Sequence, residues 1–291
     1  MKSDVSHDMQ QSAERSTTHG RRFNGNLVTG TILVLFAAAI TVLVPLIAPY
    51  HSNDLDRTAS LQGPSWAHWL GTDQLGRDLL VRVAHGYQIS FTVAIGSVAI
   101  GLVIGVPLGL LASMGGSVVD NAIMRPLDIL MSFPAIVLSI VVVAISGTGL
   151  VPIIVAIGIV YIPIIARVMR GSAVAVSREL YVEAARSRGA SVLRILGRHI
   201  LPNSFAPVLV QASLLMGIAL LLEAALSFIG LGVRPPTASL GLMLSDGRQF
   251  MANSAWVVAG PGLAIIILVL AFTAIGDGLQ EFADPRSRRR S

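Results

Sequence analysis

Side chains able to perform covalent or metal chemistry are few in this sequence, and their spacing fits no common catalytic site. The chain has no cysteine, which excludes disulfides, thiolate nucleophiles and zinc–thiolate centres. Its single lysine, Lys2, follows no glycine-rich run, so the chain cannot form the Walker phosphate loop of an ATPase. The His-Glu-x-x-His pattern of zinc proteases is absent. The six histidines all lie outside the long apolar runs: His7, His19, His51, His68, His85 and His199. We therefore expect a non-catalytic chain without a cofactor or metal.

Charged side chains gather in a polar segment from about residue 49 to residue 87, which we expect to be solvated. Gly71-Thr72-Asp73 is typical of a turn, and Thr72 or Asp73 can cap the helix that follows. Asp73, Arg77 and Asp78 can form a local ion network. This segment has either a structural role or a role in contacting another molecule.

Carboxylates within or beside the apolar runs are scarce, and Asp128, Glu223 and Asp277 all lie near run ends. Intramembrane charges usually mark ion pathways, so their scarcity argues against an ion-coupled transporter working alone. Glu223 is a candidate gate residue or subunit contact. It can pair with Arg234, with a partner chain or with the ammonium group of a substrate.

The composition indicates a membrane protein. The chain has 291 residues, of which 53% are hydrophobic and only 13% charged, against about 25% charged in soluble domains. A membrane-spanning helix needs about 20 apolar residues. Six segments qualify, at about 27–49, 90–113, 129–146, 150–166, 205–225 and 256–275. The first is too long for a cleaved signal peptide. We predict an all-α polytopic fold with six transmembrane helices, and Gly147-Thr148-Gly149 as a tight turn between the third and fourth.

Basic residues predict the orientation. If residues 1–26, 114–128, 166–204 and 276–291 face the cytoplasm, they hold 16 of the 21 Lys and Arg residues. Cytoplasmic loops of membrane proteins carry such an excess, so both termini are expected inside. The arginines are scattered between apolar runs, which favours a bilayer rather than nucleic acid as the partner.

The longest cytoplasmic loop contains residues 178–202, called the EAA loop below. Ser177 can cap a first short helix with Glu179 in its first turn, and Gly189 can end it with positive φ. Ser191 can cap a second helix, which Pro202 stops. We predict two short helices joined by a glycine turn and lying along the membrane surface.

Two interpretations of this helix pair remain open from composition. It can be an amphipathic anchor in lipid headgroups. It can also dock a protein, because Ala184 and Ala185 on the exposed face let another backbone approach and Glu183 lies among arginines.

Small residues recur every four positions in the second apolar run, at Ser97, Gly101, Gly105 and Gly109. Such a stripe permits close helix packing, against another span or a partner permease. Three prolines lie inside apolar runs and can kink their helices: Pro107, Pro134 and Pro163.

Three stretches carry a family resemblance. The EAA pattern of bacterial ABC importer permeases is Glu-Ala-Ala, three residues, Gly, nine residues, Ile, one residue and Leu-Pro. This chain follows it with Glu183-Ala184-Ala185, Gly189 and Leu201-Pro202, and has His199 where the family has Ile. The run Leu70-Gly71-Thr72-Asp73 with Gly76-Arg77-Asp78 is similar to the LGTDxxGRD stretch of peptide permeases. The run from Glu223 to Gly232 is similar to their EAxLSFLGLG stretch. Over residues 27 to 284 the chain resembles a permease subunit of the DppC/OppC type.

The resemblance implies a type I ABC importer transmembrane domain with coupling helices, in a bacterial cytoplasmic membrane. It implies a second, DppB/OppB-like permease, an extracytoplasmic peptide-binding protein and two ATPases of the DppD/DppF or OppD/OppF kind, separate or fused. ATP and Mg²⁺ would be bound by those ATPases. The ATPase-docking residues would be Glu183, Ala184, Ala185, Arg188, Gly189, His199, Leu201 and Pro202.

The resemblance also implies a division of the chain. Residues 1–26 form a cytoplasmic tail, 27–86 the first helix with an extracytoplasmic segment, 87–281 the five-helix core and 282–291 a basic tail. The extracytoplasmic motif would meet the binding protein or shape the outer gate. Import of nickel, glutathione or an opine by the same architecture remains the main alternative to peptides.

Overall fold

A computed structural model describes residues 25–283, and the two predicted tails lie almost wholly outside this range. Helices account for most of the described residues. Within them, only an isolated bridge between Thr72 and Asp78 resembles strand pairing. The helices are α2 (Gly25–Ile47), α3 (Leu79–Met114), α4 (Gly116–Met131), α5 (Ala135–Ser146), α6 (Leu150–Ser177), α7 (Leu180–Ser187), α8 (Val192–Ile195), α9 (Leu201–Phe228), α10 (Leu240–Gly247) and α11 (Trp256–Ala283). Short turns of 3₁₀ helix lie at Arg57–Ala59 and Arg248–Phe250, and a π-helical turn lies at Leu196–Ile200.

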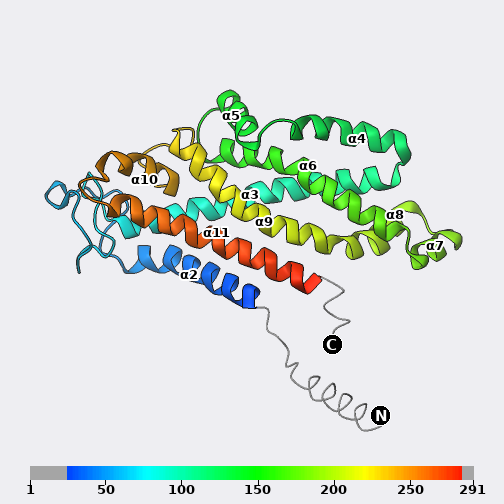
Figure 1. The fold of residues 1–291 in the computed structure, drawn as a ribbon, viewed down its shortest axis with the longest axis horizontal. Coiled ribbons are helices and arrows are strands. Elements are labelled where there is room, and N and C mark those ends of the chain that lie inside the picture. The colour runs from blue at the N-terminus through cyan, green and yellow to red at the C-terminus, as the bar shows by residue number, and fades with distance from the viewer. Residues whose placement is uncertain (1–24, 284–291) are drawn as a thin grey trace, which may run out of the picture.

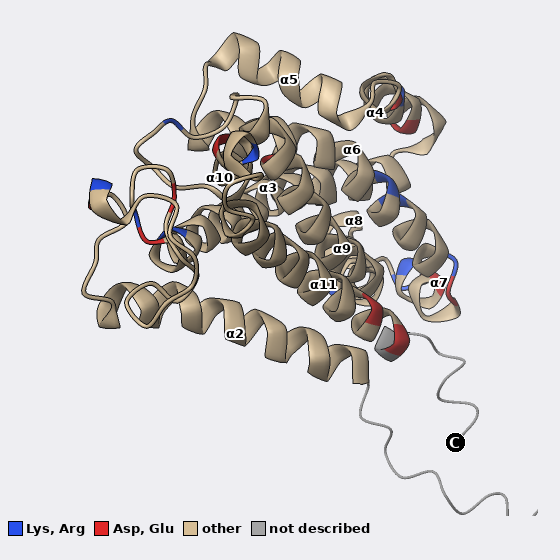
Figure 2. Ribbon diagram, turned by 60° about the vertical axis from the view of Figure 1, so that its left-hand side comes forward, with Lys and Arg blue, Asp and Glu red and all other residues tan. Residues whose placement is uncertain are grey.

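The long helices run side by side. In Figure 1, α3, α6, α9 and α11 form the centre, α2 lies along α11, and α4 lies along α6 on the opposite edge. The short helices α7 and α8 lie at one end of the bundle and α10 at the other. Charged residues gather mainly at these two ends, and the middle of the bundle is almost free of them (Figure 2). This distribution is what a bilayer core requires.

Five helices are long and apolar enough to span a membrane, and α4 with α5 makes a sixth if the bent pair is counted as one span. The all-α polytopic prediction is confirmed. The turn predicted at residues 147–149 is also present, with φ of +91° at Gly147 and +144° at Gly149.

The span predicted at about residues 129–146 is not one continuous helix. The chain breaks at residues 132–134, and α4 and α5 meet at 93°. Pro134 precedes α5 as its N-cap, because proline cannot donate the helical hydrogen bond and disfavours helical backbone in the residue before it. By contrast, Pro107 and Pro163 remain inside α3 and α6. Arg167 pairs with Asp128 at 2.5 Å and so holds α4 to α6.

Several helices are longer than their apolar runs. The helix expected at about residue 90 begins at Leu79, so His85 lies inside α3 and not outside the spans as predicted. Its Nδ1 lies 3.0 Å from the carbonyl oxygen of Val81. Helix α6 continues to Ser177, about three turns beyond its apolar run.

The small-residue stripe packs α3 on α6 of the same chain, which settles the choice between another span and a partner permease. A Cβ added to Gly105 would lie 2.8 Å from the carbonyl oxygen of Ile162. One added to Gly101 would lie 2.8 Å from Ile165, and Ser97 donates a hydrogen bond of 3.2 Å to the carbonyl oxygen of Ile154. Gly109 lies against the backbone of Ala166 in the same way. Close backbone contact of this kind is how small residues join membrane helices.

Candidate functional site

The EAA loop folds as two short helices joined by a glycine turn, as predicted. Helix α7 ends in a Schellman motif: Gly189, at φ +79°, donates to the carbonyl of Arg186 at 3.0 Å, and Ala190 donates to that of Ala185 at 3.2 Å. The predicted cap is wrong, however. Ser177 donates its hydroxyl to the carbonyl of Val174 and ends α6, and Glu179 is the N-cap of α7.

One side of α7 faces the bundle and the other is exposed. Val182 is fully buried and Ala185 is only 4% exposed, so the prediction that Ala184 and Ala185 share an exposed face holds for Ala184 alone. The exposed side presents Glu183 and Ala184, with Leu180 at 81% exposure. Helix α8 adds Leu193 at 82%. Large exposed apolar side chains beside charges are typical of a surface that contacts another protein.

The EAA loop continues into α9 without a break. Pro202 does not stop the second helix as predicted. It lies in the first turn of α9, directly after a π-helical turn, and this local change of hydrogen bonding accommodates a residue that has no N–H to donate. In this turn, Leu201 donates its N–H to the carbonyl of Leu196, five residues back. The His199 ring lies 6.2 Å from the Tyr181 ring, centroid to centroid, and so links the start of α9 to α7. Arg188 donates to the carbonyl of Ala184 at 3.2 Å.

At the opposite end, residues 71–78 form a buried turn, called the GTD turn below. Asp73 organises it. One carboxylate oxygen accepts the N–H groups of Leu75 at 2.8 Å and Arg77 at 3.0 Å. The other lies 2.6 Å from Nε of Arg77 and 3.5 Å from Nε of Arg82. The expectation of a solvated segment is wrong for this turn, since Asp73, Arg77 and Arg82 are all buried.

Asp78 has a different partner from the one predicted. It caps α3 by accepting the N–H of Val81 at 2.9 Å, a role the sequence had assigned to Thr72 or Asp73. Its other oxygen lies 2.9 Å from Nδ1 of His68, so it does not join the Asp73–Arg77 pair. The Thr72 hydroxyl instead bonds the carbonyl oxygen of Ala59 and the N–H of Gln62 within the loop.

Two glycines make the GTD turn possible. Gly71 and Gly76 have φ of +79° and +74°. A Cβ on Gly76 would overlap the carbonyl oxygen of Asp56, and one on Gly71 that of Gln62. Both the backbone conformation and the lack of space therefore require glycine.

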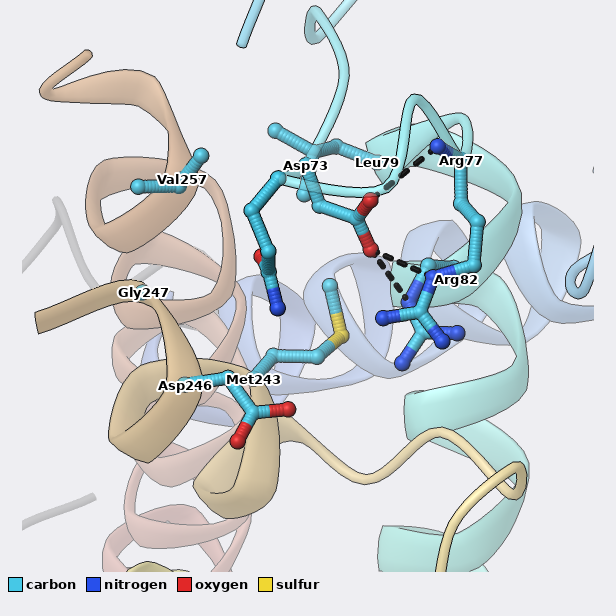
Figure 3. A pocket seen from close by; sticks show the side chains of 9 residues that line it. Asp73, Arg77, Leu79, Arg82, Met243, Asp246, Gly247 and Val257 are labelled. Atoms are coloured by element: carbon cyan, nitrogen blue, oxygen red, sulfur yellow. Dashed lines mark hydrogen bonds and ion pairs between the residues drawn. The ribbon is translucent and has the colours of Figure 1, made fainter. Parts of the chain in front are cut away.

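A cavity of about 10 Å³ lies between the GTD turn, α10 and α11, enough for one water molecule. Figure 3 shows Asp73, Arg77 and Arg82 on one side of it and Asp246 of α10 on the other.

Partial burial raises the pKa of Asp246, an effect that the charges of Arg77 and Arg82 oppose. The sequence patterns indicated neither Arg82 as a partner of Asp73 nor His68 as the partner of Asp78. Arg82 lies one helical turn after Asp78, but the predicted helix began too late to show it.

Glu223 lies inside the chain rather than at a surface. It is 1% exposed on α9, accepts the Ser227 hydroxyl at 2.8 Å and leaves its second oxygen without a hydrogen-bond partner. Arg234 does not pair with it but donates to the Thr148 hydroxyl at 2.7 Å. The predicted pair with Arg234 is therefore wrong. Burial of Glu223 within the chain argues against a subunit contact, since Gly241 at the start of α10 packs against the backbone of Ala224.

Long apolar helices packed side by side, with an exposed helix pair inserted between two of them, define a polytopic membrane protein. The chain belongs to the family described as binding-protein-dependent transport system inner membrane component, which matches residues 105–289. It is 40% identical over 261 residues to a dipeptide transport system permease protein DppC of Alkalihalophilus pseudofirmus, covering 90% of this chain and 86% of that one. It is 42% identical over 260 residues to the glutathione transport system permease protein GsiD of Pectobacterium atrosepticum, covering 89% and 86%.

The fold is similar to that of the MetNI methionine ABC transporter in an inward-facing conformation. The TM-score is 0.56 at 23% identity, and the match covers 73% of this chain and 96% of that one. The chain therefore has the fold of an ABC importer permease, in an inner membrane that it crosses several times.

Proposed function

We propose that this chain is one of two permease subunits of an ABC importer for short peptides. The main support for this proposal is the similarity of the chain, over about nine-tenths of its length, to permeases of dipeptide transport systems. A second, DppB/OppB-like permease would complete the pathway, and an extracytoplasmic binding protein would deliver the cargo.

The EAA loop is proposed to dock the ATPases that supply energy. Its exposed face combines apolar Leu180 and Leu193 with the carboxylate of Glu183, and the continuous helix from α8 into α9 provides a rigid lever. Both termini would then face the cytoplasm, since α2 begins and α11 ends at the same end of the bundle as α7 (Figure 1). The excess of arginine at this end supports that orientation.

Glutathione is the second candidate cargo, because the GsiD relative is as similar as the dipeptide permease. The test is uptake into proteoliposomes that contain this chain, its partner permease and the ATPases, with the binding protein added outside. We expect ATP-dependent uptake of a radiolabelled dipeptide. Uptake of glutathione alone would establish the second candidate, and uptake of neither would exclude both.

A further inference from the structure

A polar cavity lies at the α7 end of the bundle. Its volume is about 720 Å³, within the range of pockets that hold small ligands. Helices α6, α9 and α11 and the first turn of α2 form its walls. In Figure 1, α9 and α11 approach this end together with the start of α2.

The walls combine an apolar floor with a polar rim. Val168, Pro207, Val210 and Leu214 supply the floor. The rim carries the amides of Asn26, Gln211 and Gln280 and the carboxylates of Asp277 and Glu281. Within residues 25–283, no basic side chain lines the cavity.

The two carboxylates lie one helical turn apart on α11 and so share one side of it. Among the described residues neither has a cationic partner, and Glu281 accepts only the amide of Asn26, at 3.3 Å. Gln211 faces them from α9, within an otherwise apolar span, where a polar side chain usually serves a cavity or a pathway. The cavity is thus a negatively charged site with amide groups that can both donate and accept.

We propose that this cavity is an inner subsite of the transport path that receives the cationic ammonium group of a peptide in transit. The inference rests on the proposed function and adds a charge preference to it. Asp277 and Glu281 would attract the ammonium, the three amides would bond peptide N–H and C=O groups, and the apolar floor would accept side chains.

The cavity is mechanically connected to the EAA loop. Its first wall residue on α9, Pro207, lies seven residues after Ile200, the last residue of the π-helical turn. Seven helical residues span about 10 Å. Because the chain is helical from α8 through α9, a displacement of the EAA loop would move the α9 wall against α11 and change the width of the subsite.

The charge of the cavity can be tested without any cargo, because the chain has no cysteine. A single Gln211→Cys reporter is modified in inside-out vesicles that contain the assembled transporter, with a cationic and an anionic methanethiosulfonate of similar size. Each rate is divided by the rate of the same reagent with a free thiol in solution, because a thiolate itself favours the cationic reagent. After this correction we expect the cationic reagent to react about tenfold faster, the gain that a charged cleft gives to an oppositely charged reactant. Asp277→Asn with Glu281→Gln should bring the two rates close together. Equal rates in the parent, or an unchanged ratio in the variant, would overturn the proposal.

Cargo selectivity is the second readout. In proteoliposomes, Asp277→Asn with Glu281→Gln should lower uptake of a lysine-containing dipeptide at least threefold relative to an alanine dipeptide, by the same attraction. Asp54→Asn, which removes an exposed carboxylate at the other end of the molecule, is the matched control and should leave this ratio unchanged. If the parent imports no peptide, the proposed cargo fails, and the reagent rates still decide the charge of the site. If the ratio of lysine-dipeptide to alanine-dipeptide uptake is the same in parent and variant, the proposed subsite is overturned while the proposed peptide cargo stands.

Discussion

Gly105 of α3 and Ile162 of α6 bring their backbones into direct contact, since a Cβ on Gly105 would lie 2.8 Å from the carbonyl oxygen of Ile162. The contact sits in the middle of the most extensive helix–helix interface of the described chain. It explains why a stripe of small residues occupies the second apolar run.

Gly105→Ala should therefore destabilise the protein. The added methyl group meets backbone atoms, which cannot move aside as a side chain can, and overpacking of this kind costs about 1–3 kcal/mol. The thermal unfolding midpoint of the purified protein in detergent is the measurement. Gly171→Ala, at a helical glycine of α6 with open space around it, is the control and should leave the midpoint unchanged or slightly raised. Equal midpoints for the two variants would contradict the contact.

Gly76→Ala tests the close approach in the GTD turn. Gly76 and Gly116 have nearly the same φ, +74° and +72°, but only Gly76 has a neighbour, the carbonyl of Asp56. Gly116→Ala should cost roughly 1–2 kcal/mol from the left-handed backbone alone. Gly76→Ala should cost clearly more, measured again by thermal unfolding. If the two losses were the same, the close approach to Asp56 would carry no energy.

Asp73→Asn should be among the most damaging isosteric changes at the α10 end. It removes the carboxylate that pairs directly with Arg77 and with the 2% exposed Arg82, and breaking a buried pair costs about 3–5 kcal/mol. The fraction of chain recovered as folded monodisperse protein after detergent extraction is a suitable measure. The exposed pair of Asp54 with His51 is the comparison, and Asp54→Asn should change recovery little. Normal recovery of Asp73→Asn would show that the arginines are hydrated.

Asp246 predicts a dependence of stability on pH. Burial raises the pKa of Asp246 above the ordinary 3.8. Between the unfolded-state and folded-state pKa values, the folded protein therefore holds a proton that the unfolded chain has lost. This contribution is fully present below pH 3.8 and is lost as the pH rises through the higher, folded-state pKa. Asp246→Asn should therefore raise the unfolding midpoint at pH 7 and flatten its dependence on pH above 4. A variant that is less stable than the parent at pH 7 would mean that attraction to Arg77 and Arg82 outweighs burial.

Glu183→Arg and Gly189→Pro test the proposed docking role of the EAA loop. The first reverses the exposed charge of α7. The second imposes a negative φ where the turn has +79° and removes the N–H bonded to Arg186. Membrane insertion should remain intact, while ATP-dependent uptake and co-purification of the ATPases should fall at least tenfold. Asp54→Arg, a charge reversal at the opposite end, serves as the control. Normal uptake in both EAA variants would exclude this loop as the point of coupling.

The sequence by itself determined the features that depend on composition and on near neighbours. Apolar run length predicted the membrane fold, because a bilayer requires about 20 apolar residues per span whatever the neighbouring helices do. The glycine turn at Gly189 and the packing stripe of α3 were also readable, because both depend on residues a few positions apart.

Tertiary structure decided what depends on residues far apart in the chain. His68 became the partner of Asp78, Arg82 joined Asp73, and α10 buried Glu223, none of which periodicity predicts. The same reason explains the inner cavity. Gln211 and Asp277 are separated by more than 60 residues and meet only because α9 packs against α11. Local patterns fix helices, whereas the chemistry of a site arises where those helices cross.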